Sequence, residues 1–231
     1  MLEEIRAAQV DLVVVGGDVV PGPLPRKTIK CLLEFELPMQ FICGNGEVAV
    51  LEQMAGIDPA EVPEAYRPII RWTAQEIAEY RELLGAWPKM VDMRIPGLGD
   101  VLFCHATPRN ENEIFTRETA EERLLPVFEG ITTQVVVCGH THMQFDRMVG
   151  RTRVVNAGSV GMPFGEPGAD WLLLGDGVEL RHTPYDLERA AERILRSGYP
   201  QAKQFVASYL LKPPSEQAML AVFGQAELRY G

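Results

Sequence analysis

The feature that most constrains this chain is an apolar run that ends in two histidines. Residues 135–138 read Val-Val-Val-Cys, and Gly-His-Thr-His follows directly at 139–142. Such a run predicts a buried β-strand. Strand side chains alternate with a period of two, so His140 and His142 are expected on one face. Two imidazoles at the carboxyl end of a strand are well placed to bind a metal ion.

Histidine is otherwise scarce, with four residues in the 231-residue chain. His105 also follows an apolar run that is typical of a buried strand. His182 lies in a polar stretch and is predicted to be a surface residue. Taken alone, His105 has the alternative interpretation of a hydrogen-bonded core histidine. The pair at 140 and 142 is harder to explain by packing, and it favours metal ligation.

The composition excludes several classes of function. The chain has 32 acidic and 22 basic residues and a net charge of −10, which argues against a basic surface that binds nucleic acid. No segment approaches the roughly 20 apolar residues that span a membrane, and the N-terminus lacks the apolar core of a signal peptide. The four cysteines form no Cys-x-x-Cys pair, and three lie in apolar runs. We therefore predict reduced, buried thiols and a cytoplasmic protein.

Hydrophobic periodicity predicts strands and helices in alternation, followed by hairpins. The expected strands are 11–15, 39–43, 89–95, 101–105, 134–138, 144–148, 153–156, 171–175 and 178–183. The expected helices are 2–8, 24–35, 48–55, 63–85, 119–129 and about three segments after residue 186. This order predicts an α/β fold, a mixed β-sheet sandwich flanked by helices. One domain is expected over 1–185, with a helical C-terminal extension over 186–231 packed on it.

Five polar residues follow the predicted strands at equivalent places, in the loop just beyond the strand end. They are Asp18, Asn45, His105, His140 and His142. Ligands of open α/β folds bind at the carboxyl ends of the strands. A set of imidazole, carboxylate and amide oxygen without thiolate suits manganese, iron, cobalt or catalytic zinc. Asp18 as a turn cap and Asn45 as a turn residue are the alternative interpretations of single members of this set.

The order of these motifs resembles the calcineurin-like metallophosphoesterase superfamily. The resemblance runs from about residue 11 to 183 and rests on five segments: Gly17-Asp18, Gly44-Asn45-Gly46-Glu47, Cys104-His105-Ala106-Thr107-Pro108, Gly139-His140-Thr141-His142 and the stretch 154–161. It implies a four-layer α/β/β/α fold and a phosphoesterase that hydrolyses a phosphomonoester or phosphodiester by attack of a metal-bound hydroxide. The expected partner is a small phosphorylated substrate, and a homo-oligomer is an open alternative.

The resemblance also assigns roles to the five residues. Asp18 would bridge two divalent metal ions, with manganese favoured. Asn45, His105 and His140 would complete the shell of the second metal, and His142 would bind the first. Asp18, Asn45 and His105 are the expected catalytic residues, and Asn45 would also contact substrate. Arg109, just after the His105 motif, has two interpretations: a fork that holds the substrate phosphate, or a surface ion pair with a nearby glutamate.

Two features depart from the family. Its opening strand and Asp-x-His motif, which bind the first metal, have no match, and Met1 falls where the following helix is expected. We therefore expect a mis-assigned or truncated start and an unfilled strand position. The first metal is expected to be weakly held, with a single ion in this chain as the alternative to two. Many members also carry a general-acid histidine where this chain has Gly46. Its loss is expected to cost poor leaving groups about 10²–10⁴-fold in rate.

Two other classes of function stay open at this stage. A metal-binding or scaffold protein without catalysis would bind about one ion per chain, whereas the enzyme would bind about two. A nucleotide-binding module of the Rossmann type is disfavoured, because Gly16-Gly17-Asp18 lacks the Gly-x-Gly-x-x-Gly spacing. The C-terminal helices are predicted to be packing elements, with a dimer surface or a substrate lid as alternatives.

Overall fold

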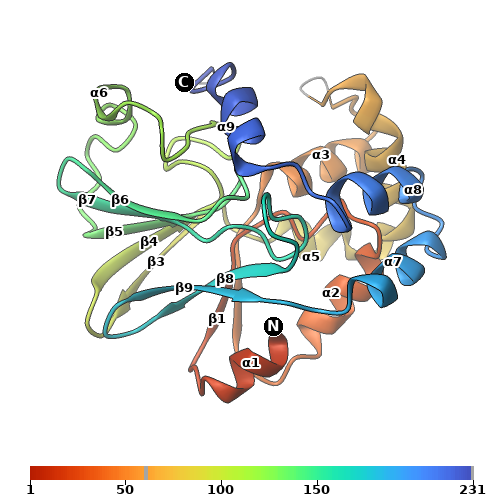
Figure 1. Cartoon of the computed structure of the whole chain (residues 1–231), viewed down its shortest axis with the longest axis horizontal. Helices are drawn as coiled ribbons and strands as arrows, with labels where there is room; N and C mark the ends of the chain where they lie inside the picture. The colour runs from red at the N-terminus through yellow and green to blue at the C-terminus, as the bar shows by residue number, and fades with distance from the viewer. Residues whose placement is uncertain (60–61, 230–231) are drawn as a thin grey trace.

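The computed structural model describes residues 1–59 and 62–229, and its centre is a sandwich of β-sheets (Figure 1). The larger sheet contains the strands β3 (Met90–Ile95), β4 (Gly99–Cys104), β5 (Val135–Cys138), β6 (Phe145–Val149) and β7 (Thr152–Asn156). They lie in the order β3-β4-β5-β7-β6. The three inner strands run parallel, and β3 and β6 pair antiparallel at the two edges. The sheet is therefore mixed, as predicted.

The alternation of side chains along β5 explains its unbroken apolar sequence. Val135 and Val137 lie in the cluster between the layers of the sandwich. Val136 and Cys138 lie in a second cluster on the opposite face, with Phe128. A strand that is buried on both faces has no solvent side on which to place a polar residue. Both faces of the sheet are thus covered, and polar residues begin where the strand ends.

The second layer of the sandwich consists of two separate two-stranded sheets. In one, β1 (Val13–Val15) and β2 (Met39–Phe41) run parallel. In the other, β8 (Ala169–Leu174) and β9 (Val178–Thr183) form an antiparallel hairpin. Val14, Ile42 and Leu172 from this layer pack against the larger sheet in one cluster. The two pairs of this layer are not hydrogen-bonded to each other in the part of the chain that the structure describes.

The long helix predicted at 63–85 is interrupted. It consists of a 3-10 turn (Glu64–Tyr66), α4 (Arg67–Glu76), a second 3-10 turn (Ala78–Tyr80) and α5 (Arg81–Gly85). The break falls at Ile77, whose φ of −126° and ψ of 27° are not helical. Ile77 and Leu84 are both fully buried in the cluster that contains Val50. The periodicity of the sequence is helical throughout, but burial of both side chains against α3 (Asn45–Met54) requires the turn.

The helix predicted at 119–129 is wrong beyond its first turn. Only α6 (Glu121–Leu124) forms there. Pro126 follows it two residues later, and a proline has no N–H to donate to the helical hydrogen bonds. The chain then leaves the helix and places Val127 and Phe128 in the core beneath the larger sheet.

The remaining helices lie outside the sheets. On the N-terminal side these are α1 (Leu2–Ala7) and α2 (Pro25–Leu33), the second starting at a proline as expected. The C-terminal extension contains α7 (Leu187–Leu195), α8 (Ala202–Phe205), a π-helical turn (Val206–Leu210) and α9 (Glu216–Gly224). Asp186 and Ser215 cap α7 and α9 through their side chains. Among the residues described, no helix is both long and apolar enough to cross a bilayer.

Candidate metal centre

Four of the five predicted ligands come from the ends of four strands and meet at one place. Asp18 follows β1 and Asn45 follows β2, while His105 and His140 follow β4 and β5. The first pair of strands is parallel, and so is the second. The carboxyl ends of parallel strands meet at the same edge, which brings residues that are far apart in sequence together.

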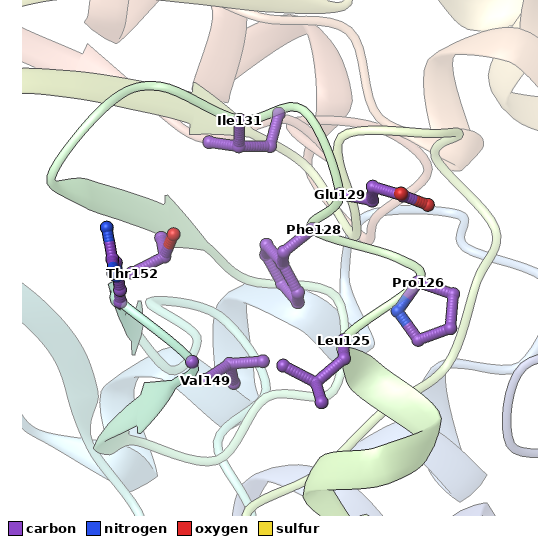
Figure 2. Close-up of a pocket in the computed structure, with 9 residues that line it drawn as sticks. Leu125, Pro126, Phe128, Glu129, Ile131, Val149 and Thr152 are labelled. Atoms are coloured by element: carbon purple, nitrogen blue, oxygen red, sulfur yellow. The ribbon is translucent and has the colours of Figure 1, made fainter.

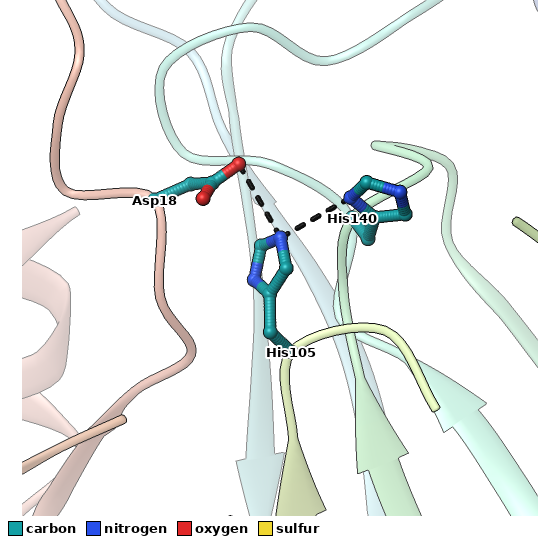
Figure 3. A group of neighbouring side chains, drawn as sticks. All are labelled: Asp18, His105 and His140. Atoms are coloured by element: carbon teal, nitrogen blue, oxygen red, sulfur yellow. Dashed lines mark hydrogen bonds and ion pairs between the residues drawn. The ribbon is translucent and has the colours of Figure 1, made fainter. Parts of the chain in front are cut away.

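The ring of His105 is at the centre of this group. Its Nε2 lies 3.0 Å from Asn45 Oδ1, 3.2 Å from His140 Nδ1 and 3.3 Å from Asp18 Oδ2. Figure 3 shows the Asp18 carboxylate and the His140 ring both directed toward the His105 ring. The ligand atoms of Asp18, His105 and His140 all lie within 4.8 Å of one another. Atoms with lone pairs therefore converge where a shared cation would satisfy them all.

Each histidine ring is held by a backbone group, which fixes its orientation. His105 Nδ1 donates to the Gly16 carbonyl at 2.8 Å, and His142 Nδ1 donates to the Met162 carbonyl at 2.9 Å. The ring of His140 is hydrogen-bonded to the backbone of Asn112. A ring nitrogen that donates to a carbonyl leaves the other nitrogen with a free lone pair, the usual arrangement of metal-binding histidines. The donor set and its orientation thus fit a divalent metal ion.

His142 is the predicted ligand that the structure places apart from this group. Its ring stacks on Phe164 with ring centres 5.5 Å apart, and it is not among the three residues whose ligand atoms lie together. Ligation by all five residues stays a prediction.

The backbone at three predicted ligands is unusual. Asp18, His140 and His142 have φ angles of 54°, 63° and 58°. A residue other than glycine adopts this left-handed region infrequently, although Asp and His tolerate it better than most. Such conformations cost about 1–3 kcal/mol each and are concentrated at functional sites. The turns after β1 and β5 therefore carry strain where the ligands are presented.

Glu47 is a residue of the site that sequence reasoning missed. Its side chain is fully buried. The carboxylate accepts hydrogen bonds from the backbone N–H groups of Asp18 at 2.8 Å, Gly44 at 2.8 Å and Val20 at 3.0 Å. It therefore ties the loop after β1 to the start of α3, and so joins the segments that carry Asp18 and Asn45. The available signal was its place as the third residue of a helix, where glutamate commonly bonds the backbone N–H of the cap.

The electrostatics of the group favour a cation. Burial raises the pKa of Asp18, but the charge and hydrogen bond of His105 outweigh it and hold this pKa well below its usual value. Burial lowers the pKa of His105, but the Asp18 carboxylate outweighs it and raises this pKa to about 9. Burial, together with the charge of His105, lowers the pKa of His140 to about 3. Without metal, His105 is thus protonated and carries the positive charge. Its neighbours Asp18 and His140 are deprotonated, which is the form in which each binds a metal ion.

Comparison with known proteins identifies the family. The sequence profile of the calcineurin-like phosphoesterase superfamily domain matches residues 1–174. The chain belongs to this superfamily. The predicted family is therefore confirmed. Members of this family depend on divalent metal ions, in agreement with the candidate metal site formed by Asp18, His105 and His140.

Two solved structures show how far the fold of this superfamily member is shared. A hypothetical protein from Pyrococcus horikoshii OT3 is 18% identical, covers 93% of this chain and 91% of its own, and has a TM-score of 0.73. A metallophosphoesterase from Sphaerobacter thermophilus is 21% identical, covers 88% of this chain and 90% of its own, and has a TM-score of 0.66. The predicted fold class is thereby confirmed. A search of curated proteins found no match.

Arg109 of this calcineurin-like phosphoesterase forms an ion pair with Glu113. An ion pair with a nearby glutamate was one of the two roles considered for Arg109 from the sequence. Its guanidinium donates to both carboxylate oxygens of Glu113, through Nε at 3.1 Å and through Nη2. Glu113 is fully buried and also accepts from Thr107 Oγ1 at 2.6 Å. Arg109 is partly exposed, with 38% of its side chain accessible. Its structural role is to neutralise Glu113, and contact with a substrate phosphate stays a prediction.

Gly46 occupies the position at which many superfamily members carry a histidine, and here no side chain fits. A Cβ atom at this position would lie 2.2 Å from the Val20 carbonyl oxygen and 2.9 Å from Asp18 Oδ1. The backbone N–H of Gly46 instead donates to Asp18 Oδ1 at 2.7 Å. The close approach of these two loops therefore requires glycine.

Replacing Gly46 by alanine is expected to lower the free energy of unfolding by about 1–3 kcal/mol, because the Val20 backbone must move. Urea denaturation of the metal-free protein measures this loss. Gly16→Ala is the matched control, since a Cβ at Gly16 meets nothing within 4 Å. Equal stability of the two variants would contradict the close approach of the loops.

A surface pocket of about 440 Å³ lies elsewhere in the molecule, between the segment after α6 and the hairpin of β6 and β7 (Figure 2). Its lining contains none of the predicted ligands and includes Leu125, Pro126, Phe128, Ile131, Val149 and Thr152. The pocket is therefore separate from the metal centre.

Proposed function

We propose that this protein is a divalent-metal-dependent phosphoesterase that hydrolyses a small phosphomonoester or phosphodiester. The observation that carries the proposal is the convergence of Asn45 Oδ1, His140 Nδ1 and Asp18 Oδ2 on His105 Nε2. In this proposal Asp18, Asn45, His105 and His140 hold one metal ion, with Asp18 shared and His142 serving a second. The oxygen and imidazole donors suit manganese, iron, cobalt or catalytic zinc, and manganese is the ion that we propose by resemblance to the family.

Bound divalent ions supply a nucleophile from water at neutral pH and neutralise the charge of the phosphoryl group. The protein supplies the rigidity of the site. The Gly16 and Met162 carbonyls orient the rings of His105 and His142. Glu47 holds the Asp18 loop against α3, and the Gly46 N–H holds the second oxygen of the Asp18 carboxylate. His105, His142 and Asp18 are therefore oriented before substrate binds, which limits the reorganisation that accompanies reaction.

The choice of leaving group follows from Gly46. No side chain at this position protonates the departing oxygen, because the Val20 carbonyl fills the space. Esters whose leaving group is stable as an anion need little proton donation, whereas alkyl leaving groups need more. We therefore propose a preference for phosphomonoesters and phosphodiesters with activated leaving groups over esters of simple alcohols.

The test is manganese-dependent hydrolysis of bis(p-nitrophenyl) phosphate by this protein, with His140→Ala as the blank. Loss of a ligand is expected to lower the rate by more than about 100-fold, since even groups that only support a ligand affect it by 10–100-fold. Residual hydrolysis by His140→Ala near the wild-type rate would refute the site.

Metal stoichiometry separates the enzyme from its alternative, a metal-binding protein without catalysis. His142 lies outside the group of Asp18, His105 and His140, and this position favours the alternative because a second metal ion would then have fewer ligands. About two manganese ions per chain in equilibrium dialysis would support the enzyme. About one ion together with no hydrolysis would support the alternative.

A further inference from the structure

The turn that presents His140 and His142 is held by a side chain from the neighbouring strand. Asn156 is the last residue of β7, and the register of the larger sheet pairs it with Cys138, the last residue of β5. The residue is buried, with 1% of its surface exposed. The side chain of Asn156 therefore meets the turn at 139–142 inside the protein, at the end of the strand beside it.

The carboxamide of Asn156 uses both its donor and its acceptor groups. Nδ2 donates to the Gly139 carbonyl and, at 3.1 Å, to Thr141 Oγ1, so that these two hydrogen bonds lie on either side of His140. Oδ1 accepts from Gly158 N at 2.9 Å. The opposite orientation of the amide would place Oδ1 against the Gly139 carbonyl oxygen, and two acceptors form no hydrogen bond. A single orientation of this amide thus fits its surroundings.

The turn needs this support because its backbone is strained. His140 and His142 have positive φ angles, 63° and 58°, and a residue other than glycine keeps such a conformation only where the surrounding structure imposes it. The Gly139 carbonyl, which accepts from the Asn156 amide, also accepts from Thr141 N at 2.7 Å and so closes the turn. Without the amide, we expect the turn to relax toward negative φ angles, and both imidazole rings would then move.

The segment that follows Asn156 supports the two ends of the turn through its backbone. Ala157 N donates to the Cys138 carbonyl at 2.8 Å, just before the turn, and Phe164 N donates to the His142 carbonyl at 3.4 Å, at its end. The contacts of the Asn156 side chain fall between these ends. A substitution of Asn156 therefore releases the middle of the turn and leaves the backbone contacts at its ends in place.

We propose that Asn156 is a positioning residue of the metal centre, whose amide fixes the His140 and His142 imidazoles in place before a metal ion binds. The inference rests on the proposed function, because it takes these two histidines as ligands. Asn156 acts through the backbone of the turn, since its hydrogen bonds are made to the turn and to Gly158. Loss of a group that orients metal ligands typically lowers metal affinity by about 10–100-fold.

The test is Asn156→Ala, a neutral change that removes the amide. In the metal-free protein, the ring NMR signals of His140 and His142 are expected to shift, while the signal of His182 stays in place. The affinity for manganese, measured by calorimetry on protein that circular dichroism shows to be folded, is expected to fall by about 10–100-fold. A purely structural role would lower the midpoint of urea unfolding but leave both of these readouts unchanged.

A second variant, Asn156→Asp, separates position from charge. It keeps the shape of the side chain but places a carboxylate oxygen against the Gly139 carbonyl oxygen or leaves that carbonyl without its donor. The added negative charge alone would raise the affinity for a cation, whereas displacement of the turn would lower it. We expect a loss of manganese affinity in this variant, and a gain would overturn the inference.

The matched control is Thr183→Val. Thr183 is also a buried residue at the end of a strand, β9, and its hydroxyl accepts from Trp171 Nε1 at 3.0 Å and donates to Glu4 Oε2 at 2.9 Å. The variant should lose stability but keep the wild-type affinity for manganese. An equal loss of affinity in Thr183→Val would show a general loosening of the protein and overturn the specific role of Asn156.

The remaining outcomes are also decisive. If neither Asn156 variant folds, Thr141→Val decides, because it removes one acceptor of the amide and leaves the Gly139 carbonyl in place. Lower manganese affinity in Thr141→Val would support the inference, and wild-type affinity would overturn it. Wild-type affinity in folded Asn156→Ala, with manganese binding and hydrolysis by the wild type intact, would refute the positioning role alone. Failure of the wild type to bind manganese would refute the proposed function and this inference with it.

Discussion

Replacing His105 by alanine is expected to abolish manganese binding and hydrolysis together. Its Nε2 is the atom that Asp18, Asn45 and His140 share, with all three within 3.3 Å. The substitution removes one ligand, and it also removes the group that keeps Asp18 charged. The half-buried Asp18 carboxylate would then lack its positive neighbour, so its pKa would rise and its affinity for a cation would fall. The affinity for manganese is expected to fall by more than about 100-fold, measured by calorimetry.

The control for this experiment is His182→Gln. His182 is the fourth histidine of the chain, and its Nδ1 pairs with Asp170 Oδ1 at 2.7 Å, outside the metal centre. Manganese affinity should be unchanged in this variant. Circular dichroism of both variants excludes unfolding as the cause of any loss. Wild-type manganese affinity in His105→Ala would disprove the metal centre, whatever the hydrolysis assay shows.

Replacing Glu47 by alanine is expected to have the largest effect on stability. Three backbone N–H groups, those of Asp18, Val20 and Gly44, would lose their acceptor. A buried donor without a partner costs about 1–3 kcal/mol, and the three together approach the total stability of an ordinary domain, about 5–15 kcal/mol. The midpoint of urea unfolding should fall sharply, and the variant should be partly unfolded without denaturant. Glu47→Gln keeps the shape and one acceptor oxygen and should lose less.

Glu52→Ala provides the matched comparison for Glu47→Ala. Glu52 lies on the same helix and is only partly buried. The substitution Glu52→Ala is expected to change the free energy of unfolding by no more than about 0.5 kcal/mol, as is usual for surface positions. If Glu47→Ala and Glu52→Ala were equally stable, the three hydrogen bonds to Glu47 would have no net effect. Its role in joining the two ligand loops would then be wrong.

The pattern of apolar and polar residues predicted those features of this protein that are determined by residues close together in the sequence. The run at 135–138 is apolar because both faces of β5 are covered, so the strand and its end were readable. The positions just after strand ends identified Asp18, Asn45, His105 and His140, and parallel pairing then brought them together. The order of the motifs along the chain was sufficient to predict the family, and the family match over residues 1–174 confirms this prediction.

Pattern failed where a distant contact outweighed a local preference. The helical periodicity of 63–85 continues through Ile77, but the helix turns there so that Ile77 and Leu84 share one core. In that segment, the free energy gained by burying apolar area exceeds the small differences in helix propensity between residues. The predicted helix at 119–129 ended at its first turn for a local reason, because Pro126 has no N–H to continue the helical hydrogen bonds.

The sequence by itself determined which residues have the chemistry for a metal centre and on which strands they lie, because strand period and strand ends are local properties. Tertiary structure alone decided how these residues are held. Glu47 became the link between two loops, and His142 was set against Phe164. Each of these outcomes depends on a partner brought near by the packing of separate elements. A single segment carries no record of such a partner, because the free energy that selects it arises only when the chain is folded.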